Sequence, residues 1–188
     1  MSYVKIVKET AHLVAPKALE ITKAFYPRLF KNNPEVYRYF NKSNQRNDRQ
    51  PHALAEAVIS FARNIDNFSS ISHALDLMAH KHCALGVQEE DYAVVHKNLM
   101  EAVVEVMKID GEIANGWSDA VLALAGILIK RERDLYDSAA SRRGGWEGKR
   151  VFLVDEVVPE AKDVISILFK PKDGKCPQYT AGDMFILR

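Results

Sequence analysis

A change in the spacing of apolar residues divides the chain into two unequal parts. Over residues 1–140 apolar side chains recur every three or four positions, as on one face of an α-helix, whereas residues 150–188 tend to alternate with a period of two. Between the two parts, residues 141–148 contain three glycines, which make the segment too flexible to continue a helix. We therefore expect a helical domain at 1–140, a linker at 141–149 and a β segment at 150–188.

The helical part contains apolar stripes for six or seven helices, so we expect a compact, mainly α domain. Asn33 and Pro34 are a helix-start pair that opens a short segment at residues 35–40. Gly86 follows another stripe and is its expected C-terminal cap. Pro27 removes a backbone donor from its helix, and we expect a kink there.

The last part of the chain is rich in β-branched residues. We expect strands at 151–158 and 164–169, a turn at Asp173 and Gly174, and a third strand at 184–187. Three strands cannot close a barrel and leave an exposed edge. This antiparallel segment is therefore expected to be incomplete or to need a covering surface.

Composition excludes several classes of function. Lys and Arg number 26 against 25 Asp and Glu, so there is no basic excess for nucleic-acid binding. Cys83 and Cys176 lack the spacing of a disulfide framework or a zinc site, which fits a reducing compartment. The longest apolar run, residues 120–129, is shorter than the roughly 18 residues that cross a bilayer. We expect a cytoplasmic protein that binds neither nucleic acid nor membrane.

Three polar side chains lie on apolar faces of the expected helices. His82 lies seven residues after Leu75 on one face, whereas His80 lies off that face. Glu132 continues the apolar stripe of Leu124 and Leu128, where an unpaired buried carboxylate would cost several kcal/mol. Tyr92 begins the stripe between them. Such positions deserve a chemical explanation as well as a structural one.

Each of these residues also has an ordinary explanation. An inward histidine is often a hydrogen-bonded core residue, and Tyr92 fits an aromatic core position with its hydroxyl near the surface. For Glu132 the alternative is a salt bridge with Arg131 or Lys130 at the end of the helix. The sequence alone leaves these alternatives open.

Together, His82, Glu132 and Tyr92 are suited to hold a metal through one imidazole nitrogen. A carboxylate that accepts a hydrogen bond from the other nitrogen fixes the tautomer and makes the imidazole more electron-donating. One protein nitrogen does not hold a free metal ion tightly, and the inward faces carry no second ligand at suitable spacing. The metal would therefore arrive inside a macrocycle, which in an all-α domain points to noncovalent haem with His82 as its ligand.

A haem that handles dioxygen also needs a hydrogen-bond donor on its other side. Tyr26 and Gln50 are candidates, because Gln50 lies one helical turn before Leu54 and Tyr26 lies one turn before Phe30. A core tyrosine and a capping glutamine are the ordinary alternatives. Phe40 either packs against a haem or fills the core.

The combined pattern resembles the flavohaemoglobin family over essentially all 188 residues. The motifs of the first half are Phe25-Tyr26 with Arg28 and Phe30, Asn33-Pro34-Glu35, Phe40-Asn41, residues 43–47 and Gln50. Those of the second half are Ala79 to His82, Tyr92, Trp117, Arg131-Glu132 and Gly144 to Gly148.

This resemblance implies a globin fold with haem b and His82 as the proximal ligand. It implies that Tyr92 and Glu132 form a charge-relay pair behind His82, and that Lys81 tunes the haem potential. On the distal side it implies that Tyr26 stabilises oxygen, helped by Gln50 and Leu54. In that family the activity is nitric oxide dioxygenase, which forms nitrate from nitric oxide and dioxygen at a ferrous haem, with electrons from NAD(P)H through FAD.

The chain also departs from the family pattern. The family's flavin-binding and nucleotide-binding motifs are absent, and Ala181 to Met184 stand where the family commonly has Pro-Gly-Gln-Tyr. Val121 replaces a common aromatic residue. We therefore expect this polypeptide not to bind FAD or NAD(P)H itself.

Three functions are compatible with these observations. The first is a nitric oxide dioxygenase that receives electrons from a separate flavin reductase or belongs to a longer chain. The second is a single-domain globin that stores, delivers or senses dioxygen. The third is a helical protein without haem, which leaves the inward positions of Glu132 and Gln50 unexplained.

Overall fold

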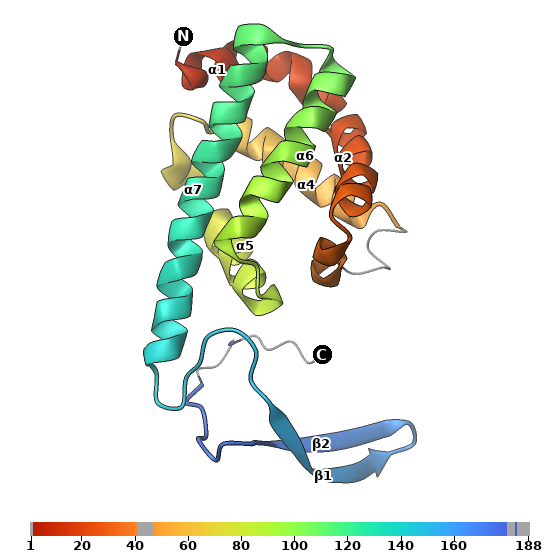
Figure 1. Cartoon of the computed structure of the whole chain (residues 1–188), viewed down its shortest axis with the longest axis vertical. Coiled ribbons are helices and arrows are strands. Elements are labelled where there is room, and N and C mark those ends of the chain that lie inside the picture. The colour runs from red at the N-terminus through yellow and green to blue at the C-terminus, as the bar shows by residue number, and fades with distance from the viewer. Residues whose placement is uncertain (1, 41–46, 180–182, 184–188) are drawn as a thin grey trace.

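A computed structural model of the chain describes residues 2–40, 47–179 and 183, which form six α-helices followed by a two-stranded antiparallel sheet (Figure 1). The helices are α1 (Tyr3–Val14), α2 (Ala18–Asn32), α4 (Arg49–Arg63), α5 (Ser72–Leu85), α6 (Glu89–Met107) and α7 (Gly111–Ser141). The strands are β1 (Phe152–Ala161) and β2 (Val164–Pro171). The mainly α fold with a short β segment, expected from the sequence, is confirmed.

The core lies where the apolar faces of the helices meet. Helix α2 packs against α4 and α6, while the long helix α7 packs against α1, α5 and α6. Fully buried side chains at these contacts include Val7, Phe25, Leu29, Ala102 and Trp117. This arrangement places α5 beside α7, which brings residues far apart in the sequence into contact.

Glycine and proline mark three points in the helical part of the chain. Gly86 adopts a left-handed conformation, with φ of 78°, directly after α5, so the predicted cap is confirmed. The short segment after Asn33 is a 3₁₀-helix (Pro34–Tyr39), rather than an α-helix. Helix α2 continues through Pro27 to Asn32, so the missing N–H does not end the helix.

The two strands form a hairpin that lies beyond the C-terminal end of α7 (Figure 1). Asp163, with φ of 64°, lies in the turn between them, and Gly174, with φ of 71°, lies in the predicted turn after β2. The third strand expected at residues 184–187 falls outside the described residues. Only one pair of strands is therefore described.

Arg150 ties the linker to the segment that follows the hairpin. Its side chain is 10% exposed, donates a 2.7 Å hydrogen bond to the carbonyl of Gly144 and forms an ion pair with Asp173. Its guanidinium also lies 5.1 Å from the centre of the Trp146 ring. These contacts give the joint a defined structure although it contains several glycines.

Helix α7 is long and apolar enough to cross a membrane by length and composition alone. Its buried residues, including Trp117 and Leu128, lie in contacts with other helices. Such a helix is also what the core of a folded helical domain requires.

Candidate functional site

Three helices bring His82, Tyr92 and Glu132 together. His82 lies in the last turn of α5, Tyr92 in the first turn of α6, and Glu132 in the second half of α7. The His82 Nδ1 atom lies 2.7 Å from Glu132 Oε1 and 3.0 Å from the Tyr92 hydroxyl, which lies 2.5 Å from the same carboxylate oxygen. The three side chains therefore form one hydrogen-bonded unit.

Glu132 is the buried member of this unit. The residue is 3% exposed, whereas the His82 side chain is 29% exposed. The alternative salt bridge with Arg131 is wrong, because Arg131 instead pairs with Asp76 and donates a 2.8 Å hydrogen bond to the Ser72 carbonyl. The inward carboxylate is satisfied by an imidazole and a phenol from two other helices.

This hydrogen-bond pattern favours one tautomer of a neutral imidazole at His82. Burial, and then the hydrogen bond to Glu132, raises the pKa of Tyr92, so the phenol keeps its proton and donates a hydrogen bond to the carboxylate. The remaining acceptor capacity of Oε1 is met by an N–H at His82 Nδ1. This tautomer leaves the lone pair of Nε2 available to a Lewis acid.

The surroundings of His82 favour a single protein ligand. His73, His80 and Lys81 are all exposed, and Lys81 joins no other candidate residue by a hydrogen bond in the described part of the chain. The described residues contain no group of three or more His, Cys, Asp or Glu side chains that could hold a metal ion. The donor set is therefore one oriented imidazole.

A second group of candidate residues surrounds Tyr26 on α2. Tyr26 is 6% exposed, and its ring centre lies 6.0 Å from that of Phe30 and 5.7 Å from that of Phe40. Its hydroxyl lies 3.5 Å from the backbone carbonyl of Gln50, so the contact with Gln50 is long and involves the main chain. Burial raises the pKa of Tyr26, which keeps the hydroxyl neutral.

The described contacts thus bring Tyr26, Phe40 and Gln50 together, with Leu54 half-buried one turn further along α4.

Sequence reasoning missed Thr22, whose buried hydroxyl donates a 2.9 Å hydrogen bond to the carbonyl of Pro51 and so ties α2 to the start of α4. It also missed Tyr136, which lies one helical turn after Glu132. Its spacing from Glu132 would have revealed it, because residues four apart share a helix face.

The globin family model matches residues 23–128 of this chain, which is more than half of its length. This chain is a globin. The bacterial globin of Campylobacter jejuni, of which it covers 97%, is 32% identical and superposes with a TM-score of 0.69 over 72% of the chain. The expectation of a globin fold is confirmed.

Longer relatives match the globin together with its β segment. The flavohemoprotein of Bordetella pertussis is 39% identical over 97% of the chain, and that of Rhodopirellula baltica is 41% identical over 95%. The flavohemoglobin of Malassezia yamatoensis, solved with bound FAD and heme, superposes with a TM-score of 0.78 and 27% identity over 93% of the chain. The chain spans 46%, 45% and 46% of these three proteins, so it corresponds to about half of their length.

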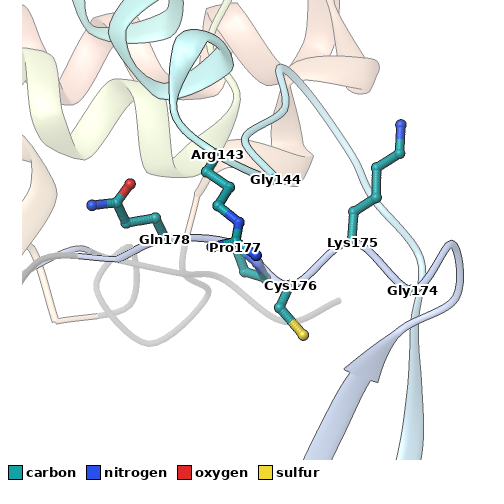
Figure 2. A pocket seen from close by; sticks show the side chains of 7 residues that line it. All are labelled: Arg143, Gly144, Gly174, Lys175, Cys176, Pro177 and Gln178. Atoms are coloured by element: carbon teal, nitrogen blue, oxygen red, sulfur yellow. The ribbon is translucent and has the colours of Figure 1, made fainter.

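This globin also has an open cavity of about 870 Å³ at the joint between the linker and the segment after β2 (Figure 2). It is lined by Arg143, Gly144, Gly174, Lys175, Cys176, Pro177 and Gln178. In Figure 2 the Arg143 side chain extends along Pro177, while Lys175 points away from it. The two cations do not converge, and the cavity contains no candidate site residue.

Proposed function

We propose that this globin binds haem b through His82 and acts as a nitric oxide dioxygenase when a flavin reductase supplies electrons. The observation that supports this most directly is the 2.7 Å contact between His82 Nδ1 and Glu132, which orients the imidazole with Nε2 available. The relatives described as flavohemoproteins support the same proposal.

The residues present fit a haem. One oriented imidazole suits a metal whose remaining ligands are supplied by a macrocycle, and a bare ion would need more donors than His82 provides. Apolar side chains on α4, α5 and α6 are only partly buried, as expected for walls that a flat apolar group covers. They are Leu54, Val58, Leu85, Val94 and Val95.

When bound, the haem would supply the iron at which nitric oxide and dioxygen are converted to nitrate, one electron being consumed for each nitrate formed. Glu132 would hold the Nδ1 proton of His82 and make the imidazole a stronger electron donor, with Tyr92 fixing the carboxylate. A strong donor favours redox turnover over simple storage.

On the distal side of a bound haem, Tyr26 would be suited to donate a hydrogen bond to a ligand, because its buried hydroxyl stays protonated. Gln50 and Leu54 would complete this wall, and Phe40 would pack against the haem. Lys81, exposed beside His82, would add a positive charge that tunes the haem potential.

We assign residues 1–140 to the globin domain, 141–149 to the linker and 150–188 to the beginning of a flavin-binding barrel. FAD and NAD(P)H would be bound by a reductase, on a separate chain or on a C-terminal continuation of this one. Because such a reductase draws on NAD(P)H, the activity belongs in the cytoplasm.

A second function, in which the globin stores, delivers or senses dioxygen, is favoured by one observation. The globin of Campylobacter jejuni is matched over 97% of its length without a reductase part. A carrier would react with nitric oxide once and then stop, whereas an enzyme would turn over.

The experiment that tests the proposal adds nitric oxide to the haem-loaded protein in its ferrous, oxygenated form, together with NADH and a generic flavin reductase. We expect many equivalents of nitrate per protein, and one equivalent when the reductase is omitted. A single equivalent in both reactions would support the carrier and contradict the enzyme.

His82→Ala and His80→Ala form a matched pair on the same helix. His82→Ala is expected to abolish the five-coordinate ferrous spectrum and the turnover, while His80→Ala leaves both nearly unchanged because His80 is exposed. Equal effects of the two substitutions would refute His82 as the ligand.

A further inference from the structure

Helix α7 contacts both the side chain of His82 and the turn that follows it. Glu132 and Tyr136 lie one helical turn apart, so both point toward the end of α5. Glu132 accepts the imidazole hydrogen bond, and the Tyr136 hydroxyl donates a 2.7 Å hydrogen bond to the Val87 carbonyl. The Cys83 carbonyl lies 3.5 Å from the same hydroxyl.

The turn fastened by Tyr136 is hydrogen-bonded to His82 itself. The Val87 N–H donates a 3.0 Å hydrogen bond to the His82 carbonyl, and the Gly86 N–H donates a 3.0 Å bond to the Cys83 carbonyl. These two bonds, with the left-handed Gly86, form a Schellman motif at the end of α5. Tyr136 is therefore linked to the backbone of His82 through a single residue, Val87.

The opposite end of α5 is attached to α7 independently. Arg131 donates hydrogen bonds of 2.8 Å to the Ser72 carbonyl and 3.0 Å to the Ser72 hydroxyl, and it pairs with Asp76. Ser72 lies ten residues before His82, at the other end of the helix. Loss of the Arg131 contacts would free the start of α5 and leave the Schellman motif in place.

We propose that Tyr136 is a positioning residue for His82, which fixes the end of α5 against α7 so that the imidazole keeps its short hydrogen bond to Glu132. This inference rests on the proposed role of His82 as haem ligand. Burial raises the pKa of Tyr136, which keeps the hydroxyl protonated and able to donate. No other hydroxyl donates to the Val87 carbonyl within the described part of the chain.

The test compares Tyr136→Phe with Arg131→Gln, which detach opposite ends of the same helix. The first readout is the iron–histidine stretching band of the ferrous, haem-loaded protein by resonance Raman spectroscopy. Because a looser bond from Nδ1 to Glu132 makes the imidazole a weaker donor, Tyr136→Phe is expected to shift this band to lower wavenumber and broaden it. Arg131→Gln is expected to leave it in place.

The second readout is hydrogen exchange at the Val87 amide. Loss of one hydrogen bond is expected to speed exchange there about two- to tenfold in Tyr136→Phe, with no change in Arg131→Gln. An unmoved band in Tyr136→Phe, or an equal shift in both variants, would overturn the inference while the proposed function stands. Absence of the band from the unsubstituted protein would overturn the haem ligand, and unchanged Val87 exchange would independently show that Tyr136 fixes nothing.

Discussion

Asn98 is a buried polar residue that joins α6 to the end of α2. It is 1% exposed and accepts a 2.9 Å hydrogen bond from the Asn32 amide. Its own amide group donates to Asn33 Oδ1 at 3.1 Å and to the Val94 carbonyl at 2.8 Å. Because burial of an amide is costly unless its groups are paired, this side chain fixes where α2 ends.

Asn98→Ala is expected to lower the free energy of unfolding by about 2–3 kcal/mol, since it removes buried packing and leaves polar partners unpaired. Denaturant unfolding followed by circular dichroism measures this change. Asn115→Ala is the control, because Asn115 is exposed on α7 and is expected to change stability by less than about 0.5 kcal/mol. Similar losses in both variants would mean that the hydrogen bonds of Asn98 add little.

For single residues, helical spacing predicted the inward position of Glu132 but not its hydrogen-bond partner. The spacing gives a direction from one helix axis, whereas the choice between Arg131 and His82 depends on how α5 and α7 pack. Gln50 shows the same limit on the other side of the site. Its side chain was expected to act on the distal side, yet the contact with Tyr26 is made by its backbone carbonyl.

Among the elements, α1 and α7 pack closely at Gly116. A Cβ atom built at Gly116 would lie 2.6 Å from Ile6 Cδ1 and 2.8 Å from Ile6 Cβ. A Cβ built at Gly126, on the same helix, would meet nothing within 4 Å. A side chain at Gly116 would therefore disturb the packing of α1 against α7, whereas a side chain at Gly126 would not.

Gly116→Ala is expected to destabilise the protein by about 1–3 kcal/mol, because Ile6 or the whole of α1 must move. Gly126→Ala is expected to stabilise it by about 0.5–1 kcal/mol, since alanine costs less backbone entropy in a helix. Thermal or denaturant melts of the two variants decide the sign of each change. If both substitutions stabilised the protein, α1 would have to move away from the new methyl group without any loss of stability.

Element types were predictable where one signal dominated. The apolar period and Gly86 predicted α5 and its end, because the left-handed conformation of a helix cap favours a residue without a Cβ. The segment after Pro34 became a 3₁₀-helix, which periodicity over six residues cannot separate from an α-helix. The β-bulge at Asp155, where the register shifts between Val154 and Glu156, depends on strand pairing and has no comparable signal in the sequence.

On the scale of the whole molecule, the hairpin exposes an apolar face. Val154 and Val157 pair with Phe169 and Ile167, and the bulge keeps all four on one face, together with Ile165. These side chains are 42–58% exposed. An isolated two-stranded hairpin is marginally stable, and an exposed apolar face with free edges favours association.

The chain is therefore expected to self-associate through this face as its concentration rises. Ile167 and Leu168 provide a matched test, because they are neighbours on β2, are 44% and 45% exposed, and point to opposite faces. Ile167→Lys is expected to reduce the association measured by sedimentation velocity, since a charge on the apolar face resists burial, while Leu168→Lys has a smaller effect. Once loaded with haem, both variants should have the spectrum of the unsubstituted protein, because both positions lie on the hairpin, beyond the C-terminal end of α7 (Figure 1). Equal effects of the two substitutions would show that the strand edges, rather than the apolar face, drive association. A chain that stays monomeric at all concentrations would contradict the prediction that this exposed face drives self-association.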